Sequence, residues 1–222
     1  MPHTPAHDGY NPDLLAMIPR SLTRVVEVGS SSGALAREYK RVCPTCRYVG
    51  IEIDARYVEL SKRFCDEVVC ADIENIEPST FESLFPSDCW IFGDTLEHLK
   101  DPWAVLNRLR AHLAAGSSVV ACIPNAQHWS MQARLNIGML HYEDAGLLDR
   151  THLRWFTRRT IVELFQSTGF RVVDATSRIF DEPLREKVSD AIRLMAKSIG
   201  ADPDEALADS KPFQYVLRVE PA

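Results

Sequence analysis

The hydrophobic residues of this chain fall into short runs that alternate with longer amphipathic stretches. From Arg24 onward the runs are rich in Val and Ile, and turn residues separate one run from the next. This alternation is typical of βαβ units, in which helices cover a mostly parallel sheet. Seven runs are predicted to be strands: 24–28, 47–53, 66–72, 89–94, 117–124, 170–177 and 213–220. We therefore predict an α/β fold with a seven-stranded sheet.

Two of the intervening segments carry complete helix signals. Residues 101–116 have Pro at the first helical position, leucines at helical spacing, and Gly116 just beyond the end. Residues 157–169 begin with the capping residue Thr157 and stop at Gly169. Such start and stop residues satisfy the backbone groups that the ends of a helix leave unpaired. Both segments are predicted to be helices that pack on the sheet.

Two further segments do not fit simple alternation within what we predict to be a single domain, residues 1–222. Residues 125–157 separate the fifth strand from the next helix by far more than the usual ~2 to 6 residues, and loops of this length are often functional. We expect a helical lid there that contacts a bound ligand. Residues 183–212 are predicted to contain a packing helix and then a solvated, mobile acidic loop. The predicted buried stripe of that helix comprises Leu184, Val188, Ile192, Met195 and Ile199.

Composition narrows the classes of partner. With 222 residues, 45% hydrophobic residues and a net charge of -6, the chain has the composition of an ordinary soluble globular protein and lacks the basic excess of a nucleic-acid binder. It has no apolar run near the ~18 residues of a membrane span, and its start has neither a basic nor a long apolar leader region. We expect a cytoplasmic protein, a monomer or homodimer, that binds neither nucleic acid nor membrane.

Polar side chains follow the first four predicted strands. The turn Gly29-Ser30-Ser31-Ser32-Gly33 follows the first strand and opens a helix near Ala34. Glu52, Asp72 and the group Asp94, Glu97 and His98 follow the next three strands. In an open α/β sheet, ligands bind beyond the carboxyl ends of the strands, and helix N-terminal N–H groups suit an anion. An acid about ~20 residues after the first glycine commonly binds ribose hydroxyls.

Two ligand classes share this scaffold, dinucleotides and S-adenosylmethionine. A dinucleotide turn has the pattern G-x-G-x-x-G, so that bare backbone can approach a pyrophosphate. Here Ser31 occupies the middle glycine position and Ala34 the last. The turn alone does not decide between the two ligands.

The motifs that accompany the turn carry a resemblance to a known family. "EVGSSSG", "GIEID", "ADIE", "DTLEHLKDPW" and "IPN" occur in the order and at the spacing seen in class I S-adenosylmethionine-dependent methyltransferases, which residues 22–173 strongly resemble. The resemblance implies a Rossmann-like sheet with strand order 3-2-1-4-5-7-6 and an antiparallel last strand. It departs from the family at Ser31, where glycine is usual, and this puts the usual conformation of the turn in doubt.

The same resemblance implies roles for individual residues toward S-adenosylmethionine. Glu27, Gly29 and Gly33 would shape the pocket for the methionine part, Glu52 would bind the ribose, and Asp72 the adenine amino group. The hydroxyls of the turn serines could donate to the methionine carboxylate. The full expected cofactor set is Glu27, Gly29, Ser30, Ser31, Gly33, Glu52, Ile53, Asp72, Ile73, Asp94 and Leu96.

The predicted lid carries a narrower resemblance. "IPNAQHW" and "GLLDRTHLRWFTRRTIVELFQSTGF" look like a bacterial subgroup of small-molecule methyltransferases of sugar, secondary-metabolite or quinone type. The implied function is in-line transfer of a methyl group to an oxygen or nitrogen of a small-molecule acceptor. The alternatives are a peptide or protein methyltransferase and a non-catalytic module that binds an adenosyl ligand.

Histidines near the predicted pocket bear on the nature of the acceptor. A hydroxyl acceptor must lose its proton, so a general base is needed. The candidates are His152, His128 and His98, with Asp94 or Asp149 as orienting carboxylates. Each histidine is also compatible with a half-buried structural role. No metal site is assigned, because neither the lone Cys43/Cys46 pair nor the spacing of Asp94 and His98 matches a specific ligand pattern.

Overall fold

The computed structural model describes residues 8–222, so the first seven residues of the predicted domain, where no leader was expected, lie outside the described part. Its single sheet has the predicted order β3-β2-β1-β4-β5-β7-β6. The strands are β1 Arg24–Val28, β2 Arg47–Glu52, β3 Glu67–Cys70, β4 Cys89–Gly93, β5 Ser118–Pro124, β6 Phe170–Arg178 and β7 Gln214–Pro221. The first five run parallel, and β7 is antiparallel to both β5 and β6. The predicted Rossmann-like fold is confirmed.

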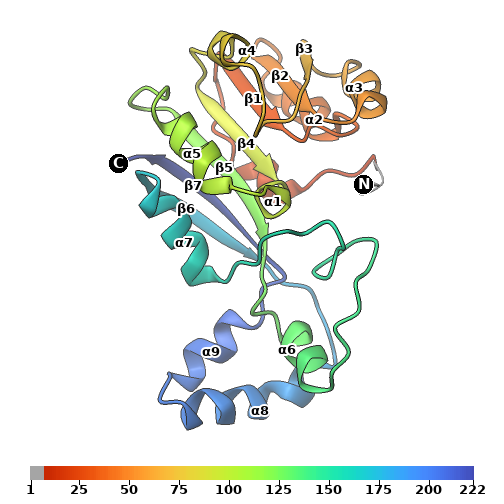
Figure 1. The fold of residues 1–222 in the computed structure, drawn as a ribbon, viewed down its shortest axis with the longest axis vertical. Coiled ribbons are helices and arrows are strands. Elements are labelled where there is room, and N and C mark those ends of the chain that lie inside the picture. The colour runs from red at the N-terminus through yellow and green to blue at the C-terminus, as the bar shows by residue number, and fades with distance from the viewer. Residues whose placement is uncertain (1–7) are drawn as a thin grey trace.

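Helices cover both faces of the sheet (Figure 1). They are α1 Pro12–Met17, α2 Ala34–Val42, α3 Ala55–Ser61, α4 Pro78–Ser83, the short 3₁₀ helix η1 Leu96–His98, α5 Pro102–Arg110, α6 Trp129–Asn136, α7 Arg158–Ser167, α8 Arg185–Ser198 and α9 Pro203–Asp209. Apolar residues of α4, α5 and α7 form one core with the sheet, and those of α1 and α2 form a core on the other face. No helix within residues 8–222 is long and apolar enough to cross a membrane.

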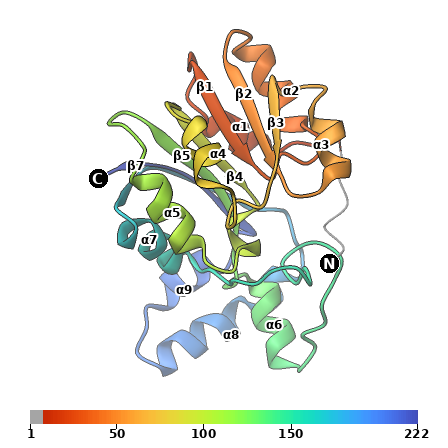
Figure 2. The ribbon, with the colours of Figure 1, turned by 45° about the horizontal axis from the view of Figure 1, so that its top comes forward.

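Helices α6, α8 and α9 lie together beyond the carboxyl ends of the central strands, at the lower end of Figures 1 and 2. The predicted stripe of α8 is largely wrong. Ile192 is buried, but Leu184, Met195 and Ile199 are exposed, and the buried side of the helix is completed by Ser189 and Ala196. The small side chains face the neighbouring helices because they permit close approach, which hydrophobic spacing alone could not reveal.

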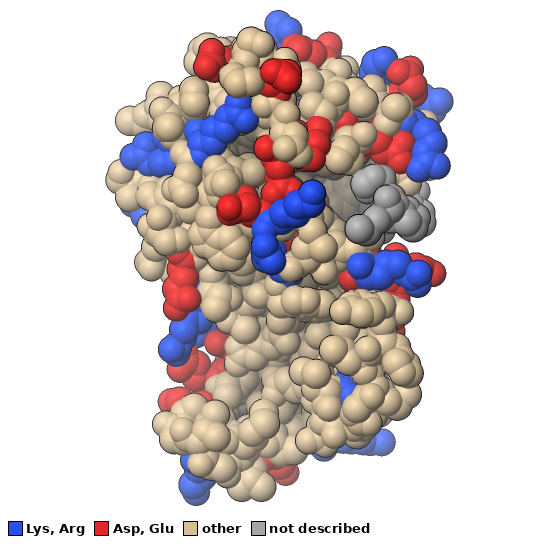
Figure 3. Space-filling view, viewed as in Figure 1, with Lys and Arg blue, Asp and Glu red and all other residues tan. Residues whose placement is uncertain are grey.

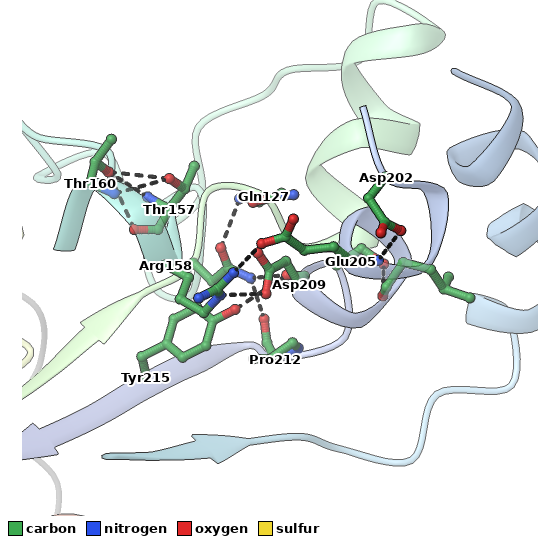
Figure 4. A network of polar contacts seen from close by, with 12 residues as sticks. Gln127, Thr157, Arg158, Thr160, Asp202, Glu205, Asp209, Pro212 and Tyr215 are labelled. Atoms are coloured by element: carbon green, nitrogen blue, oxygen red, sulfur yellow. Dashed lines mark hydrogen bonds and ion pairs between the residues drawn. The ribbon is translucent and has the colours of Figure 1, made fainter. Parts of the chain in front are cut away.

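The acidic segment before the last strand is helix α9, not the mobile loop that its composition suggested. Asp202 caps the helix by accepting from the backbone N–H groups of Asp204 and Glu205. The guanidinium of Arg158 at the start of α7 lies between Glu205 and Asp209, at 2.6 and 2.7 Å (Figure 4). The acidic residues are therefore held against the rest of the chain.

Residues 125–157 begin and end at the same place. Asn125 pairs with Phe156, and the Asn125 side-chain amide donates to the carbonyls of Asp209 and Pro212, both at 2.8 Å. Further along, the indole N–H of Trp129 donates to the carboxylate of Glu182 at 2.6 Å. The insertion is thus anchored to the α8 and α9 region rather than attached only through its two ends.

Candidate active site

The turn after β1 has an irregular backbone that brings it close to its neighbours. Gly29, Ser31 and Gly33 have φ values of 78°, 47° and 76°, all in the left-handed region. The N–H of Gly29 donates to Ile51 O at 2.8 Å, which fixes the turn to β2. A Cβ on Gly33 would lie 3.0 Å from the backbone of Ser61. The turn therefore keeps a glycine-like conformation at Ser31, at the cost of some backbone strain in a residue that has a side chain.

The serines of the turn differ in what they contact. Ser30 is buried, and its hydroxyl bonds to that of Ser61 at 3.3 Å. A Cβ at position 50 would come within 2.6 Å of Ser30 Oγ, so Gly50 makes room for it. The N–H of Ser31 donates to Glu52 Oε2 at 2.8 Å. Ser30 thus packs between β2 and α3, while Ser31 contributes its backbone to the sheet edge.

The acidic residues at the ends of β2 and β3 are held by nearby hydrogen-bond donors. Glu52 is buried and accepts from the N–H groups of Ser31 and, at 3.0 Å, Asp54. Asp72 accepts from Glu74 N and Asn75 Nδ2, at 2.9 and 2.7 Å. Of the isoleucines that follow these strands, Ile73 is buried and Ile53 is half exposed. Both carboxylates stand at the edge where the turn lies, in fixed orientations.

Glu27 lies deeper, in the middle of the sheet. Its carboxyl group accepts from the Tyr48 hydroxyl at 3.0 Å. Burial raises the pKa of Glu27 to about 8, although the bond from Tyr48 lowers it. Without a ligand, Glu27 therefore keeps its proton at neutral pH. A cation close to it would favour the ionised form.

The end of β4 adjoins the turn. The hydroxyl of Thr95 donates to Val28 O at 2.9 Å, and a Cβ on Gly29 would lie 3.0 Å from that hydroxyl. Asp94 has a φ of 52°, and its carboxylate accepts from the side-chain amide of Gln214 on β7. Leu96 is fully buried. Thr95 thus joins the turn after β1 to η1, the element that carries the next polar groups.

Two of the three predicted histidines meet beside η1. The rings of His98 and His152 lie 4.8 Å apart at 65°. The N–H groups of Leu153 and Arg154 donate to Glu97 O at 2.8 and 2.9 Å, which pins the segment after His152 to η1. Burial, and then the neighbouring His98, lower the pKa of His152. The lowered pKa favours the neutral imidazole at pH 7, the form that has a lone pair on one ring nitrogen.

Glu97, which lies between the two histidines and the core, was not among the predicted site residues. Its side chain is 1% exposed, and neither carboxylate oxygen has a hydrogen-bond partner within residues 8–222. Burial, together with the charges of Asp94 and Asp149, raises its pKa well above the usual range. The motif "DTLEHL" contains Glu97, but its burial became visible only in the fold.

The third predicted histidine, His128, has different neighbours. It is fully buried at the start of α6, where Nδ1 lies 2.8 Å from Ser130 Oγ and Nε2 lies 3.1 Å from Glu182 Oε2. Burial lowers its pKa. These contacts place it where α6 meets the segment before α8, and none of them is to the pair His98 and His152.

The first helix also reaches the site and was not predicted. Its Leu14 packs so closely on Gly93 that a Cβ there would lie 2.7 Å from Leu14 Cδ2. Asn11 caps the helix and also donates to Cys122 Sγ at 3.3 Å. The sequence "NPDLL" holds the signal, an Asn cap followed by Pro. Gln214, in contrast, offered none, because its partner Asp94 is 120 residues away.

The donor groups at this edge fit an adenosyl amino-acid ligand. Glu52 and Asp72 offer carboxylate acceptors for hydroxyl and amino groups, and the turn at Gly29 lies close to the start of α2. The fold and this donor set define an α/β enzyme of the S-adenosylmethionine-binding type.

Comparison with known proteins gives the family. Residues 8–175 match the family model described as "Methyltransferase domain". The chain belongs to this family and is a methyltransferase, as its motifs predict, and S-adenosylmethionine is the cofactor that the assignment brings with it. No curated protein sequence matches the chain significantly.

Solved structures agree in fold at low sequence identity. The mitomycin 7-O-methyltransferase is 13% identical with a TM-score of 0.58; the match covers 94% of this chain and 52% of that enzyme, so the chain spans about half its length. The plantazolicin methyltransferase, solved with S-adenosylhomocysteine, is 11% identical (TM-score 0.58, 94% and 79% covered). A candidate methyltransferase from Bacillus halodurans is 12% identical (TM-score 0.60, 95% and 98% covered).

Proposed function

We propose that this protein transfers the methyl group of S-adenosylmethionine to an oxygen or nitrogen of a small molecule. The observation that carries the proposal is that His98 and His152 lie beside η1, the element that follows Thr95, and that Thr95 packs against the proposed cofactor turn. Thr95 contacts Gly29 and directly precedes η1, on which His98 lies. An acceptor hydroxyl between the turn and this pair would meet the methyl donor on one side and a neutral imidazole on the other.

Methyl transfer from a sulfonium is an in-line displacement whose thioether leaving group needs no acid. The protein contributes by positioning the acceptor, excluding water and removing a proton where the acceptor carries one. In this proposal Glu52 binds the ribose, Asp72 and Ile73 bind the adenine, and Glu27 lies near the ammonium. His152 accepts the proton, and residues 125–157 cover the acceptor. Asp94 helps to orient the acceptor.

The surface supports a small and uncharged acceptor over a polyanion. On the face shown in Figure 3, Lys and Arg are interspersed with Asp and Glu and form no continuous basic region. The net charge of -6 points the same way, because nucleic-acid binding draws on clustered basic side chains. The mitomycin enzyme named above acts on a secondary metabolite, which also favours this acceptor class.

The test has two stages. Calorimetry should show that S-adenosylmethionine and S-adenosylhomocysteine bind at micromolar concentration. Labelled methyl donor should then be incubated with phenols, sugar alcohols, amines and unstructured peptides. Transfer to a small molecule, reduced about 10²-fold or more in His152→Ala, supports the proposal. Transfer to peptides alone favours the protein-methyltransferase alternative. Binding without any transfer favours a non-catalytic module, and absence of cofactor binding rejects the proposal.

A further inference from the structure

The buried carboxylate of Glu97 needs a partner that the described residues do not supply. Burying a carboxyl group without hydrogen bonds is costly, and such groups in native proteins usually have a specific reason. Neither oxygen of Glu97 is bonded, although its backbone carbonyl accepts two N–H groups. The residue is therefore held rigidly while its side chain remains available to a ligand.

The imidazole rings of His98 and His152 lie beside the Glu97 carboxylate and could supply nitrogen ligands. One donor atom from each of Glu97, His98 and His152 can be chosen so that all three lie within 4.8 Å of one another. Glu97 Oε1 and His152 Nε2 are 4.0 Å apart. Ligands about 2.1 Å from a first-row metal ion lie roughly 3 to 3.5 Å from one another. The longest of these separations would have to shorten by roughly 1.3 to 1.8 Å, through rotations of the three side chains, to close the set around an ion.

In both rings Nδ1 has a hydrogen-bond partner, as is usual for histidines that bind a metal through Nε2. Nδ1 of His152 faces Leu147 O at 3.3 Å. Nδ1 of His98 lies 3.2 Å from Thr151 O and 3.0 Å from Thr151 Oγ1, whose own proton goes to Asp149 at 2.6 Å. Both rings therefore donate from Nδ1, so in the neutral form Nε2 carries the lone pair. Backbone carbonyls and carboxylates commonly orient metal-bound histidines in this way.

We propose that Glu97, His98 and His152 bind a divalent first-row transition-metal ion. Two imidazoles and one carboxylate suit Zn²⁺, Co²⁺, Mn²⁺ or Fe²⁺, and three protein ligands leave coordination positions open. The set combines adjacent residues of η1 with a residue 54 positions later, which explains why sequence spacing gave no metal pattern.

The role of the ion rests on the methyl transfer proposed above, whereas its binding does not. An open position beside the cofactor turn would take an acceptor oxygen and lower the pKa of its hydroxyl group. With the ion bound, His152 is one of its ligands and does not act as the base; the ion then activates the hydroxyl group in its place, and the hydroxyl proton leaves to water. The oxygen lone pair then forms the new C–O bond while the electrons of the C–S bond return to sulfur. The acceptor class would therefore be a hydroxyl compound able to coordinate a metal.

The test measures binding directly on the full chain after chelator treatment and dialysis. Co²⁺ is titrated while its visible absorption is recorded, and equilibrium dialysis with Zn²⁺ gives the stoichiometry. We expect one ion per chain. Glu97→Gln and His152→Ala should each weaken the affinity by about 100-fold, whereas the exposed controls Glu163→Gln and His141→Ala should leave it unchanged.

Circular dichroism and S-adenosylhomocysteine affinity establish that each variant is folded, and His152→Gln serves if either main variant is not. Absence of stoichiometric metal binding, or equal binding by the variants and the wild type, overturns the inference. Metal binding without methyl transfer leaves the inference intact and counts against the proposed function. Methyl transfer that survives complete metal removal supports the function and rejects the role of the ion.

Discussion

The proposed cofactor half of the site comprises the turn 29–33, Glu52 and Asp72, and the proposed acceptor half comprises Glu97, His98 and His152. The two halves satisfy their polar groups in opposite ways. In the cofactor half, the Glu52 carboxylate accepts two backbone N–H groups and Asp72 accepts from two residues directly after it. In the acceptor half, Glu97 is buried with no side-chain hydrogen bond in the described chain. In the first half the carboxylates have hydrogen bonds in the absence of a ligand. In the second half the buried carboxylate of Glu97 has none within the described residues.

This difference follows from how each half is built. The cofactor residues stand directly at the ends of parallel strands, so local backbone donors reach them. The proposed acceptor residues come from η1 and from residues 125–157. Backbone bonds from Leu153 and Arg154 to Glu97 O join these two segments, and so do the contacts of His98 with Thr151. A rigid cofactor site can thus be combined with an acceptor site whose details an insertion determines.

The largest effect is expected from breaking the cofactor half at Glu52. Glu52→Ala removes the expected ribose acceptor and leaves the N–H groups of Ser31 and Asp54 without their carboxylate. We expect the affinity for S-adenosylhomocysteine to fall about 100-fold, equivalent to about 2.7 kcal/mol. Calorimetry measures this loss. Glu67→Ala, a surface carboxylate paired with Arg47, is the control, and a change below threefold in Glu52→Ala would contradict the assignment.

A second prediction uses the titration of Glu27. Its folded-state pKa of about 8 exceeds the unfolded value, so the native state binds this proton more tightly. The resulting contribution to the free energy of unfolding is fully present below the unfolded pKa and is lost as pH rises through about 8. Glu27→Gln should abolish this pH-dependent part of the free energy of unfolding, which amounts to about 3 to 4 kcal/mol between pH 5 and pH 8.

Urea denaturation of both proteins at the two pH values provides the check. Other buried groups titrate as well. The relevant quantity is therefore the change in unfolding free energy from pH 5 to pH 8 in the wild type minus the same change in Glu27→Gln. Glu27→Gln keeps an acceptor for Tyr48, which makes it the matched substitution. Parallel pH profiles for the two proteins would show that Glu27 ionises normally in the fold.

The contrast between the halves also explains what the sequence could predict. The strand order follows from the resemblance, and Glu52 and Asp72 could be proposed as cofactor residues because each lies at the end of a strand-like run. The meeting of His98 with His152 required knowing how the insertion folds back. The composition of residues 202–209 suggested a loop because it could not show that Arg158 would neutralise two of its acids. Local signals thus determined the cofactor half, and long-range contacts determined the rest.

A smaller effect is expected when the anchor of the acceptor half is removed. Arg158→Ala deletes two partly exposed ion pairs with Glu205 and Asp209. We expect a loss of about 1 kcal/mol in unfolding free energy, or roughly 2 to 4 °C in melting temperature. The affinity for S-adenosylhomocysteine should stay within twofold. Arg171→Ala, which removes one exposed pair with Glu220, is the control. A loss of about 1 kcal/mol in the binding free energy of S-adenosylhomocysteine as well would show that the two halves are coupled.

The smallest effect concerns the strained serine of the cofactor turn. Ser31→Gly relieves a φ of 47° but increases the entropy of the unfolded chain, so these opposing terms should leave a net gain below about 1 kcal/mol. Cofactor affinity should stay within twofold, because the contact that Ser31 makes with Glu52 comes from its backbone N–H. Thermal melts and calorimetry measure both. Ser32→Gly, at a position without positive φ, should instead be destabilising. A tenfold loss of affinity in Ser31→Gly would mean that its hydroxyl binds the ligand, which is the role that the sequence suggested for the turn serines.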